Sequence, residues 1–489
     1  MYTTEPQPKT GNRVHEVHAG KALGGGSVNN FGAWSRGDAT DYNDWARIVG
    51  DQRWSYEGLL PYFRKSESFF DSKADPKQHG FEGPIRITSV SESDPNRRYP
   101  LREPIREAWN EIGVQYIPDA CSGNLSGISE FLETWYDGKR QTTQQAYSLE
   151  GVNVITEATV HRVEFADGDQ SEQKRVIAVF LSDGRRFSAR KEVILAAGTL
   201  QTPQVLMLSG IGPGNTLSQY GISTVIDAPE VGKNLNDHFA LYQLYKLRNP
   251  ERGLALGSPT LSDPAFIKGF PTDWAINQDV PRHVLEAAVH NDNARFSSSI
   301  NESLLKPGRP LVETLVLYAP IGAPGIPLDG SFIMTSVMLL AATSRGTVSI
   351  RSSSPTDSPL VDSNYFHTEA DRVTLVHGTR RTVQALLETS ALADYVEAEV
   401  PFSGMSALSS QSSDDEFEAR IRAAGMAHYH PAGTAAMGKV VDPDLRVYGV
   451  QNIRVADASI LPLSIGGHPQ ATLYTVAEQA ADIILGAKA

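Results

Sequence analysis

Residues 190–213 read RKEVILAAGTLQTPQVLMLSGIGP, and this segment indicates the class of fold. The run 193–196 is short and continuously apolar, as in a parallel strand that is buried on both faces. A helix is expected to follow, with Thr202 as its N-cap, Pro203 at its first position and Gly210 after its last turn. Because a buried strand followed by a loop and a helix is the repeating unit of α/β proteins, we predict an α/β fold.

Elements with other periodicities flank this unit. Residues 152–166 and 175–190 alternate between apolar and polar side chains, which predicts antiparallel strands. Near the C-terminus, apolar residues recur at helical spacing and would line one face of a helix. The remaining expected elements are helical pieces within 41–64, strands at 332–340, 346–351 and 452–456, and helices at 369–387 and 469–485.

The composition is that of a globular protein with an excess of acidic residues. Of the 489 residues, 40% are hydrophobic, and 44 Lys and Arg oppose 57 Asp and Glu, so the formal net charge is −13. This balance argues against nucleic acid and against an anionic membrane surface as partners. No apolar run approaches the roughly 18 residues that a membrane helix needs. At about 150 residues per domain, the length predicts two to four domains.

Cysteine usage restricts the metal chemistry but not the compartment. Cys121 is the only cysteine. One cysteine excludes an intrachain disulfide and a zinc site built on cysteines, and the sequence predicts no metal site. Because secreted proteins can also lack disulfides, both a cytoplasmic and a secreted location remain open.

A glycine-rich stretch is the first candidate for ligand binding. Residues 18–37 read HAGKALGGGSVNNFGAWSRG, which is too rich in glycine to pack a core. Gly24, Gly25 and Gly26 stand in a row, and Ser27 and Asn30 follow them. Because glycine lets the backbone turn sharply and approach another molecule closely, we expect a loop that lies against a ligand.

Two histidines near the C-terminus stand in places suited to chemistry. His430 precedes Pro431 and Gly433, which predicts a turn rather than a packed helix face. His468 stands at the start of the expected helix 469–485, where unpaired N–H groups attract negative charge. Two imidazoles in such places could share a proton transfer. The alternative from spacing alone is a pair of hydrogen-bonded structural histidines.

Several segments, in order along the chain, resemble the glucose–methanol–choline (GMC) oxidoreductases, which are FAD-dependent alcohol oxidases and dehydrogenases. The segment GKALGGGSVNNFGAWSRGDATDYNDW (20–45) is similar to the glycine-rich loop of this family, although Gly26 stands where a Ser is usual. The other matching segments are ILAAGTLQTPQVLMLSGIGP (194–213), VGKNLNDH (231–238), SRGTVSIRSSSPTDSPLVDSNYF (344–366), HPAGTAAMG (430–438), VVDPDLRVYGVQNIRVADASILP (440–462) and HPQATLYTVAEQAADII (468–484). The resemblance covers nearly the whole chain.

The resemblance implies a set of site residues. His430 aligns with the base that takes the proton of the substrate hydroxyl, and His468 aligns with the partner that hydrogen-bonds the substrate oxygen. The residues that align with FAD-binding positions are Gly24, Gly25, Gly26, Ser27, Asn30, Val160, Asp457, Ala458, Pro469, Gln470 and Ala471. Of these, Val160 suits the core of a strand nearly as well. The first N–H groups of the helix at 469–485 would stabilise the negative charge of reduced flavin.

The resemblance also implies two domains that are each assembled from separate segments. A Rossmann-like FAD-binding domain is expected from 1–50, 150–240 and 430–489. A substrate-binding domain of α+β type, with a mostly antiparallel sheet, is expected from 51–149 and 241–429.

One motif of the family has no match in the sequence. A complete FAD domain opens with a strand, a G-x-G-x-x-G loop and a helix, which hold the ADP half of FAD. The nearest string, GIGPGN (210–215), lacks the last glycine and follows a helix. We therefore expect an FAD domain that is incomplete at its N-terminal end. The chain would then be a piece of a longer protein, a homologue that has lost FAD, or one that binds flavin in a reduced mode or with a separately encoded piece.

The function expected from the resemblance is oxidation of a small-molecule alcohol to an aldehyde or ketone, with FAD as hydride acceptor, in secondary metabolism. Trp34, Phe31 and Tyr429 favour an apolar or aromatic alcohol, although each also suits core packing and a polyol remains open. The alternative is a flavin-free homologue with a non-redox acid/base or binding role. The sequence leaves the assembly open, a homodimer included.

Overall fold

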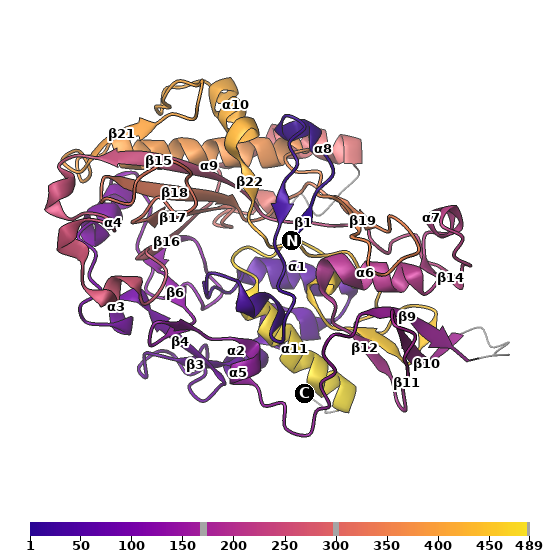
Figure 1. Cartoon of the computed structure of the whole chain (residues 1–489). Helices are drawn as coiled ribbons and strands as arrows, with labels where there is room; N and C mark the ends of the chain where they lie inside the picture. The colour runs from indigo at the N-terminus through magenta and orange to yellow at the C-terminus, as the bar shows by residue number, and fades with distance from the viewer. Residues whose placement is uncertain (167–173, 297–302, 487–489) are drawn as a thin grey trace.

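The largest sheet of the protein has seven antiparallel strands (Figure 1). The structure is a computed structural model and describes residues 1–166, 174–296 and 303–486. The strand order is β21 (Val396–Val400), β15 (Phe239–Leu247), β18 (Phe332–Leu339), β17 (Val312–Leu317), β16 (Trp274–Gln278) and β5 (Gly127–Glu130), and β22 (Met426–Ala427) also pairs with β15. Every pair is antiparallel, so the predicted antiparallel sheet is confirmed.

Helices cover one face of this sheet. Helix α9 (Glu369–Leu387) packs against β17, β18 and β21, while α8 (Arg282–Phe296) and α10 (Asp414–Ala424) pack against α9; Figure 1 shows the three helices together on one side. Thr314 of β17 and Thr382 of α9 share a hydrogen bond of 3.0 Å. Because side chains alternate along a strand, Glu313 points to the opposite face, where the candidate site lies.

A second region combines short strands with helices. Strands β12 (Val193–Leu195) and β24 (Ile453–Val455) pair in parallel, which confirms the mixed α/β fold. Strand β10 (Lys174–Leu181) pairs antiparallel with β9 (Val160–Phe165) and β11 (Arg186–Ser188), as predicted. The predicted strand from residue 152 is wrong at its start, because 152–159 contains no strand.

Strand β12 is less buried than its apolar sequence predicts. Ile194 in its middle is 42% exposed. Among the strands that the structure describes, β12 pairs with β24 alone, so no strand covers its other edge. The expectation of a strand buried on both faces is therefore wrong here.

The helix after β12 also begins earlier than predicted. Helix α6 spans Gly198–Leu208, whereas Thr202 was the predicted N-cap. The Asp457 carboxylate accepts hydrogen bonds from the Gly198 N–H at 2.9 Å and from the Thr202 hydroxyl at 2.6 Å. Asp457, which is distant in sequence, therefore supplies the hydrogen-bond acceptor for the first turn of this helix. Gly210, with φ of 81°, follows the helix end as predicted.

Pro203 consequently lies inside α6 rather than at its first position. Its missing N–H leaves the Thr199 carbonyl without a helical partner. The Thr434 hydroxyl donates to that carbonyl at 2.6 Å, and the Thr199 hydroxyl donates to the Pro431 carbonyl at 2.8 Å. The two hydrogen bonds of Thr199 therefore join α6 to Pro431 and Thr434, which lie at the two ends of the segment that follows His430.

The two long helices match their predicted bounds closely. Helix α9 begins and ends as predicted, and the Thr368 hydroxyl accepts from the Asp371 N–H to cap it. Helix α11 (Gln470–Leu485) begins one residue later than predicted and is capped at its C-terminal end by Gly486, with φ of 68°. The strands predicted at 332–340, 346–351 and 452–456 are confirmed as β18, β19 (Thr347–Ser349) and β24.

The helical pieces predicted within 41–64 are α1 (Ala39–Val49) and α2 (Tyr56–Ser66), and α2 packs against α11. The remaining strands and helices are β1 (Tyr2–Thr3), β2 (Glu16–Val17), β3 (Glu67–Phe69), β4 (Ile85–Ser89), α3 (Val90–Ser93), α4 (Arg102–Glu111), β6 (Leu132–Glu133), β7 (Trp135–Tyr136), β8 (Lys139–Arg140), α5 (Thr143–Ala146), β13 (Ile211–Gly212), α7 (Gly214–Gln219), β14 (Ile226–Asp227), β20 (Leu360–Asp362) and β23 (Val450–Gln451).

A buried ion pair joins the segment before α1 to the first residue of β3. Arg36 Nη2 donates to Glu67 Oε1 at 2.6 Å, and neither side chain is exposed. Arg36 also donates to the Cys121 carbonyl at 2.8 Å, while Glu67 contacts His79 Nδ1 at 3.0 Å and accepts from Trp34 Nε1 at 3.2 Å. Burial by itself lowers the pKa of Arg36, but the Glu67 carboxylate raises it above its ordinary value. The guanidinium therefore stays charged.

Of the helices in the described ranges, none is both long and apolar enough to cross a membrane. The division of the chain into two discontinuous domains stays a prediction.

Candidate active site

Four imidazoles gather where the antiparallel sheet meets α11. His238 precedes β15, His428 and His430 follow β22, and His468 precedes α11. The ring centres of His430 and His468 are 5.1 Å apart, and those of His238 and His430 are also 5.1 Å apart. The structure thus brings the two histidines predicted to act in catalysis next to each other.

Hydrogen bonds determine which nitrogen of His430 carries a proton. The Ser464 hydroxyl donates to the Leu340 carbonyl at 3.0 Å, so Ser464 accepts from His238 Nε2 at 3.1 Å. A neutral His238 with its proton on Nε2 accepts at Nδ1, and His430 Nδ1 therefore donates to it across 2.9 Å. Neutral His430 is left with an unprotonated Nε2.

Burial keeps His238, His428 and His430 neutral. It lowers the pKa of His430 well below its ordinary value, and the neighbouring imidazoles lower it further. Burial likewise lowers the pKa of His428 well below its usual range and that of His238 to about 3. The rings therefore carry no extra proton at neutral pH, and the lone pair on His430 Nε2 stays available to act as a general base toward a bound hydroxyl.

A buried carboxylate holds His468. His468 Nε2 lies 2.8 Å from Glu313 Oε1 on β17, and the Glu313 side chain is 2% exposed. Glu313 pairs across the sheet with Asn277 of β16, and both line a small cavity with His468, Ser129 and Trp34. Within the described ranges, Ser129 Oγ and Asn277 Oδ1 are buried without a hydrogen-bond partner. The cavity therefore has unused hydrogen-bonding groups beside His468.

Asp237 holds the backbone of His430. Asp237 Oδ1 accepts from the His430 N–H at 2.7 Å, and Oδ2 accepts from the Tyr365 hydroxyl at 2.5 Å. Burial raises the pKa of Asp237 to about 7, although both hydrogen bonds oppose the rise. Near neutral pH this carboxyl is therefore partly protonated.

The raised pKa of Asp237 should make stability depend on pH. Between about pH 4 and 7 the folded state keeps a proton that the unfolded state releases, because an unfolded Asp titrates near 3.9. The free energy of unfolding is therefore expected to fall as pH rises through this window, by up to about 1.4 kcal/mol per pH unit, and then to level off. Urea unfolding of wild type and Asp237→Asn across the window measures this slope. Equal slopes in the two proteins would contradict the assignment.

The glycine-rich loop lies beside the start of α11. Gly24 has φ of 100°, which glycine adopts without strain. A Cβ at Gly25 or Gly26 would meet no atom within 4 Å, so this part of the loop faces open space. Asn30 Nδ2 donates to Gln470 Oε1 at 3.1 Å and joins the loop to the helix.

This loop and the helix end fit the reacting half of a flavin. Pro469 is the N-cap of α11 and no side chain caps the helix, so the first N–H groups, at Gln470 and the buried Ala471, are available to an anionic partner. The open space at the glycines leaves room for a planar ring. The G-x-G-x-x-G loop, which holds the ADP half of FAD in this family, is absent from the sequence.

The other residues predicted to bind FAD make contacts within the protein. The Ser27 hydroxyl donates to the carbonyl of Gly24 at 2.6 Å. Asp457 caps α6, and the Ala458 carbonyl accepts from the backbone of the segment after His430. Val160 begins β9 and packs partly buried against the core. Val160 thus has the surroundings of a strand residue, and the roles of all these residues in binding FAD stay predictions.

Sequence reasoning assigned no role to His238, His428, Asp237, Ser464 or Glu313. His238 and Asp237 end the segment VGKNLNDH, which the resemblance included without a function. Glu313 is the only charged residue in the apolar strand VETLVL (312–317), and this break in the pattern is the signal that could have found it.

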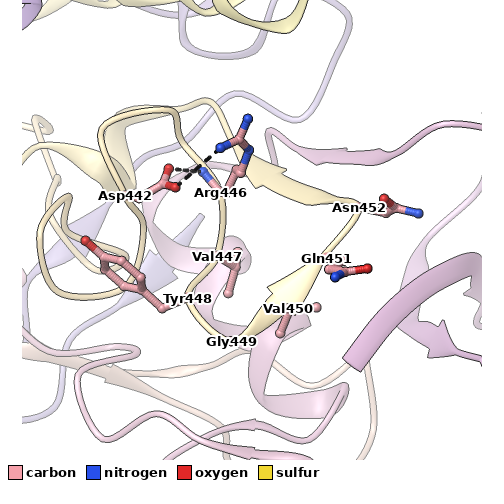
Figure 2. A pocket seen from close by; sticks show the side chains of 8 residues that line it. All are labelled: Asp442, Arg446, Val447, Tyr448, Gly449, Val450, Gln451 and Asn452. Atoms are coloured by element: carbon pink, nitrogen blue, oxygen red, sulfur yellow. Dashed lines mark hydrogen bonds and ion pairs between the residues drawn. The ribbon is translucent and has the colours of Figure 1, made fainter. Parts of the chain in front are cut away.

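A second pocket is formed by residues between 442 and 452 (Figure 2). Arg446 and Asp442 form an ion pair of 3.9 Å there, and Tyr448 is exposed. No histidine and no residue of the predicted site lines this pocket. The candidate active site is therefore the pair His430 and His468, of which His468 also lines the small cavity.

Comparison with known proteins identifies the family. Residues 7–240 match the N-terminal family model described as GMC oxidoreductase, and residues 342–477 match the C-terminal one. The chain belongs to the GMC oxidoreductases, which are flavoproteins with FAD as cofactor.

Individual relatives resemble the chain over almost its whole length. GMC-type oxidoreductase acuG of Aspergillus aculeatus is 39% identical over 486 residues, which cover 99% of this chain and 88% of that protein. A variant of formate oxidase from Aspergillus oryzae RIB40 superposes with a TM-score of 0.86 at 26% identity, over 99% of this chain and 88% of that one. A fungal aryl-alcohol oxidase superposes with a TM-score of 0.84 at 25% identity, over 99% and 89%. FAD-dependent oxidation is therefore the general reaction of this protein.

Proposed function

We propose that this protein oxidises a small-molecule alcohol to an aldehyde or ketone, with His430 as the base. The observation that carries the proposal is the proton arrangement around His430, which leaves its Nε2 unprotonated next to His468. The similarity to an aryl-alcohol oxidase supports an alcohol as the substrate.

FAD, bound beside the glycine-rich loop, supplies the hydride acceptor for this reaction. His430 Nε2 takes the proton of the substrate hydroxyl as the carbinol carbon gives up its hydride. Glu313 orients His468 through Nε2, which leaves Nδ1 for the substrate oxygen; His468 holds that oxygen toward His430 when both of its ring nitrogens carry a proton. The uncapped start of α11 stabilises negative charge that develops beside it.

The polar side chains next to His468 favour an alcohol with a second polar group. Acceptors beside His468 come from Glu313, Asn277 and Ser129. Binding of a ligand is most favourable when it supplies a hydrogen bond that a buried polar group lacks. Of the aromatic residues that favoured an apolar substrate, Trp34 lines the cavity, whereas Phe31 is 51% exposed. A small alcohol with a polar and an apolar side suits this lining best.

The absorption spectrum of the purified protein, before and after addition of FAD and desalting, tests the proposal. We expect retained flavin bands that bleach under anaerobic conditions when a substrate alcohol is added. A folded protein that stays colourless would contradict the redox proposal and favour the flavin-free acid/base alternative. Retained flavin that no member of a panel of polar, aromatic and aliphatic alcohols bleaches would contradict the alcohol as substrate.

Ser464 should affect the reaction through the tautomer of His430. Ser464→Ala removes the acceptor for His238 Nε2–H, so the proton of His238 can move to Nδ1 and the proton of His430 to Nε2. We expect kcat to fall about tenfold, because the free-energy cost of one lost hydrogen bond corresponds to about that factor in rate. Steady-state kinetics measure the rate, and nitrogen-15 NMR of labelled histidines reports which nitrogen is protonated. Ser464→Thr keeps the hydroxyl and should restore both; an unchanged tautomer in Ser464→Ala would contradict the mechanism.

A further inference from the structure

His428, His430 and His468 form a compact triangle of imidazoles. One ring nitrogen from each lies within 4.8 Å of the others. Their ring centres are 4.9, 5.1 and 5.6 Å apart. Three imidazoles on one tetrahedral Zn²⁺, with Zn–N distances of about 2.0–2.1 Å, have ring centres about 5 Å apart. From this match we propose that the three histidines form a binding site for a divalent transition-metal ion such as Zn²⁺.

Each of these rings has a neighbour on one nitrogen, which leaves the other for a metal. Glu313 holds His468 Nε2 at 2.8 Å, His238 holds His430 Nδ1 at 2.9 Å, and Ser336 Oγ lies 3.4 Å from His428 Nε2. Metal-binding histidines characteristically donate their second nitrogen to such a group, a carboxylate above all.

The other ring nitrogen of His428 also points to a ligand. Among the residues that the structure describes, His428 Nδ1 is buried and has no hydrogen-bond partner. Burial of a nitrogen without a hydrogen-bond partner costs folding free energy, and a bound metal ion would supply the missing partner. The mechanism proposed above uses His430 and His468 but leaves His428 without a task, so the third imidazole needs a separate explanation.

The composition of the cluster indicates the class of ion. Imidazole nitrogens prefer Zn²⁺, Cu²⁺ and Ni²⁺ over Mg²⁺ and Ca²⁺, which prefer oxygen. All three candidate ligands are histidines, so the site is a nitrogen site. Spacing in the sequence did not predict it, because the third ligand comes from a different segment.

Metal binding at this site would control the reaction. A metal on His430 Nε2 occupies the lone pair that must accept the substrate proton. Zn²⁺ should therefore inhibit in competition with the alcohol, and a chelator should restore activity. This consequence rests on the proposed function, whereas binding itself does not.

Calorimetric titration of the chelator-treated full chain with ZnCl₂ tests the site directly. We expect one Zn²⁺ per chain. His428→Gln should weaken binding by more than the about 10- to 100-fold that loss of an outer-shell partner costs, and Glu313→Gln should weaken it by about that amount. His290→Gln removes an exposed histidine on α8 and should change nothing.

Co²⁺ gives a second measurement that needs no variant. Tetrahedral nitrogen ligation produces intense visible bands, and weak octahedral bands would overturn the proposal. Absence of Zn²⁺ binding to the wild type, or unchanged affinity in His428→Gln, would overturn it too. Zn²⁺ binding by a protein that oxidises no alcohol would leave the metal site standing and contradict only the proposed function.

Discussion

Replacement of His430 by alanine is expected to lower kcat for alcohol oxidation by about 10²- to 10⁴-fold, the usual contribution of a general base. The hydrogen-bond chain through His238 and Ser464 leaves His430 Nε2 free, and burial keeps the ring neutral. Without the imidazole the substrate hydroxyl has no acceptor in this position. Stopped-flow measurement of flavin reduction checks the rate of this step.

Two comparisons separate loss of the base from damage to the site. The His430→Ala variant should retain its flavin spectrum, because the glycine-rich loop and α11 do not depend on this ring. His290→Ala, at an exposed position on α8, should keep the wild-type rate. A His430→Ala protein that reduces its flavin as fast as the wild type would exclude His430 as the base.

Glu67→Ala is expected to destabilise the protein by about 3–5 kcal/mol, because it leaves the charge of Arg36 buried and unpaired. Both side chains are fully buried and their nitrogen and oxygen lie 2.6 Å apart. Removal of the carboxylate also takes the partner of Trp34 Nε1 away. Chemical denaturation followed by tryptophan fluorescence and circular dichroism measures the loss.

The matched control replaces both members of the pair. Arg36→Met combined with Glu67→Leu removes both charges and keeps much of the volume, so it should cost much less than Glu67→Ala alone. If the double variant were less stable than the single one, or if Glu67→Ala were as stable as the wild type, the unpaired charge would not be the cause.

Local sequence signals predicted the long helices but not the start of α6. Helix α9 has a Thr cap and apolar residues at helical spacing, so its bounds follow from its own residues. Helix α6 begins earlier because Asp457, 259 residues away, supplies its cap. The exposure of Ile194 was unpredictable for a related reason, since burial of a strand depends on which neighbours cover it.

The same distinction applies to the site. His430 and His468 could be found because each stands in a motif with a turn or a helix start next to it. Glu313 touches His468 across 155 residues, and His238 touches His430 across 192. Such pairs are set by the packing of separate elements, because Glu313 lies on β17 whereas His468 precedes α11. A charged residue in an apolar strand marks Glu313 as unusual, but it does not show which residue Glu313 contacts. The polar groups around the two histidines therefore emerged from the structure alone.

The position of Thr199 couples the stability of α6 to that of the segment after His430. Its hydroxyl and its carbonyl bind the segment after His430 at both ends, at Pro431 and Thr434, and the carbonyl is available only because Pro203 has no N–H. The loop and α6 therefore open together as one cooperative unit, and their amide hydrogens should exchange with solvent at a common free energy. The proline that interrupts the helix thus leaves free the carbonyl that holds the histidine segment in place.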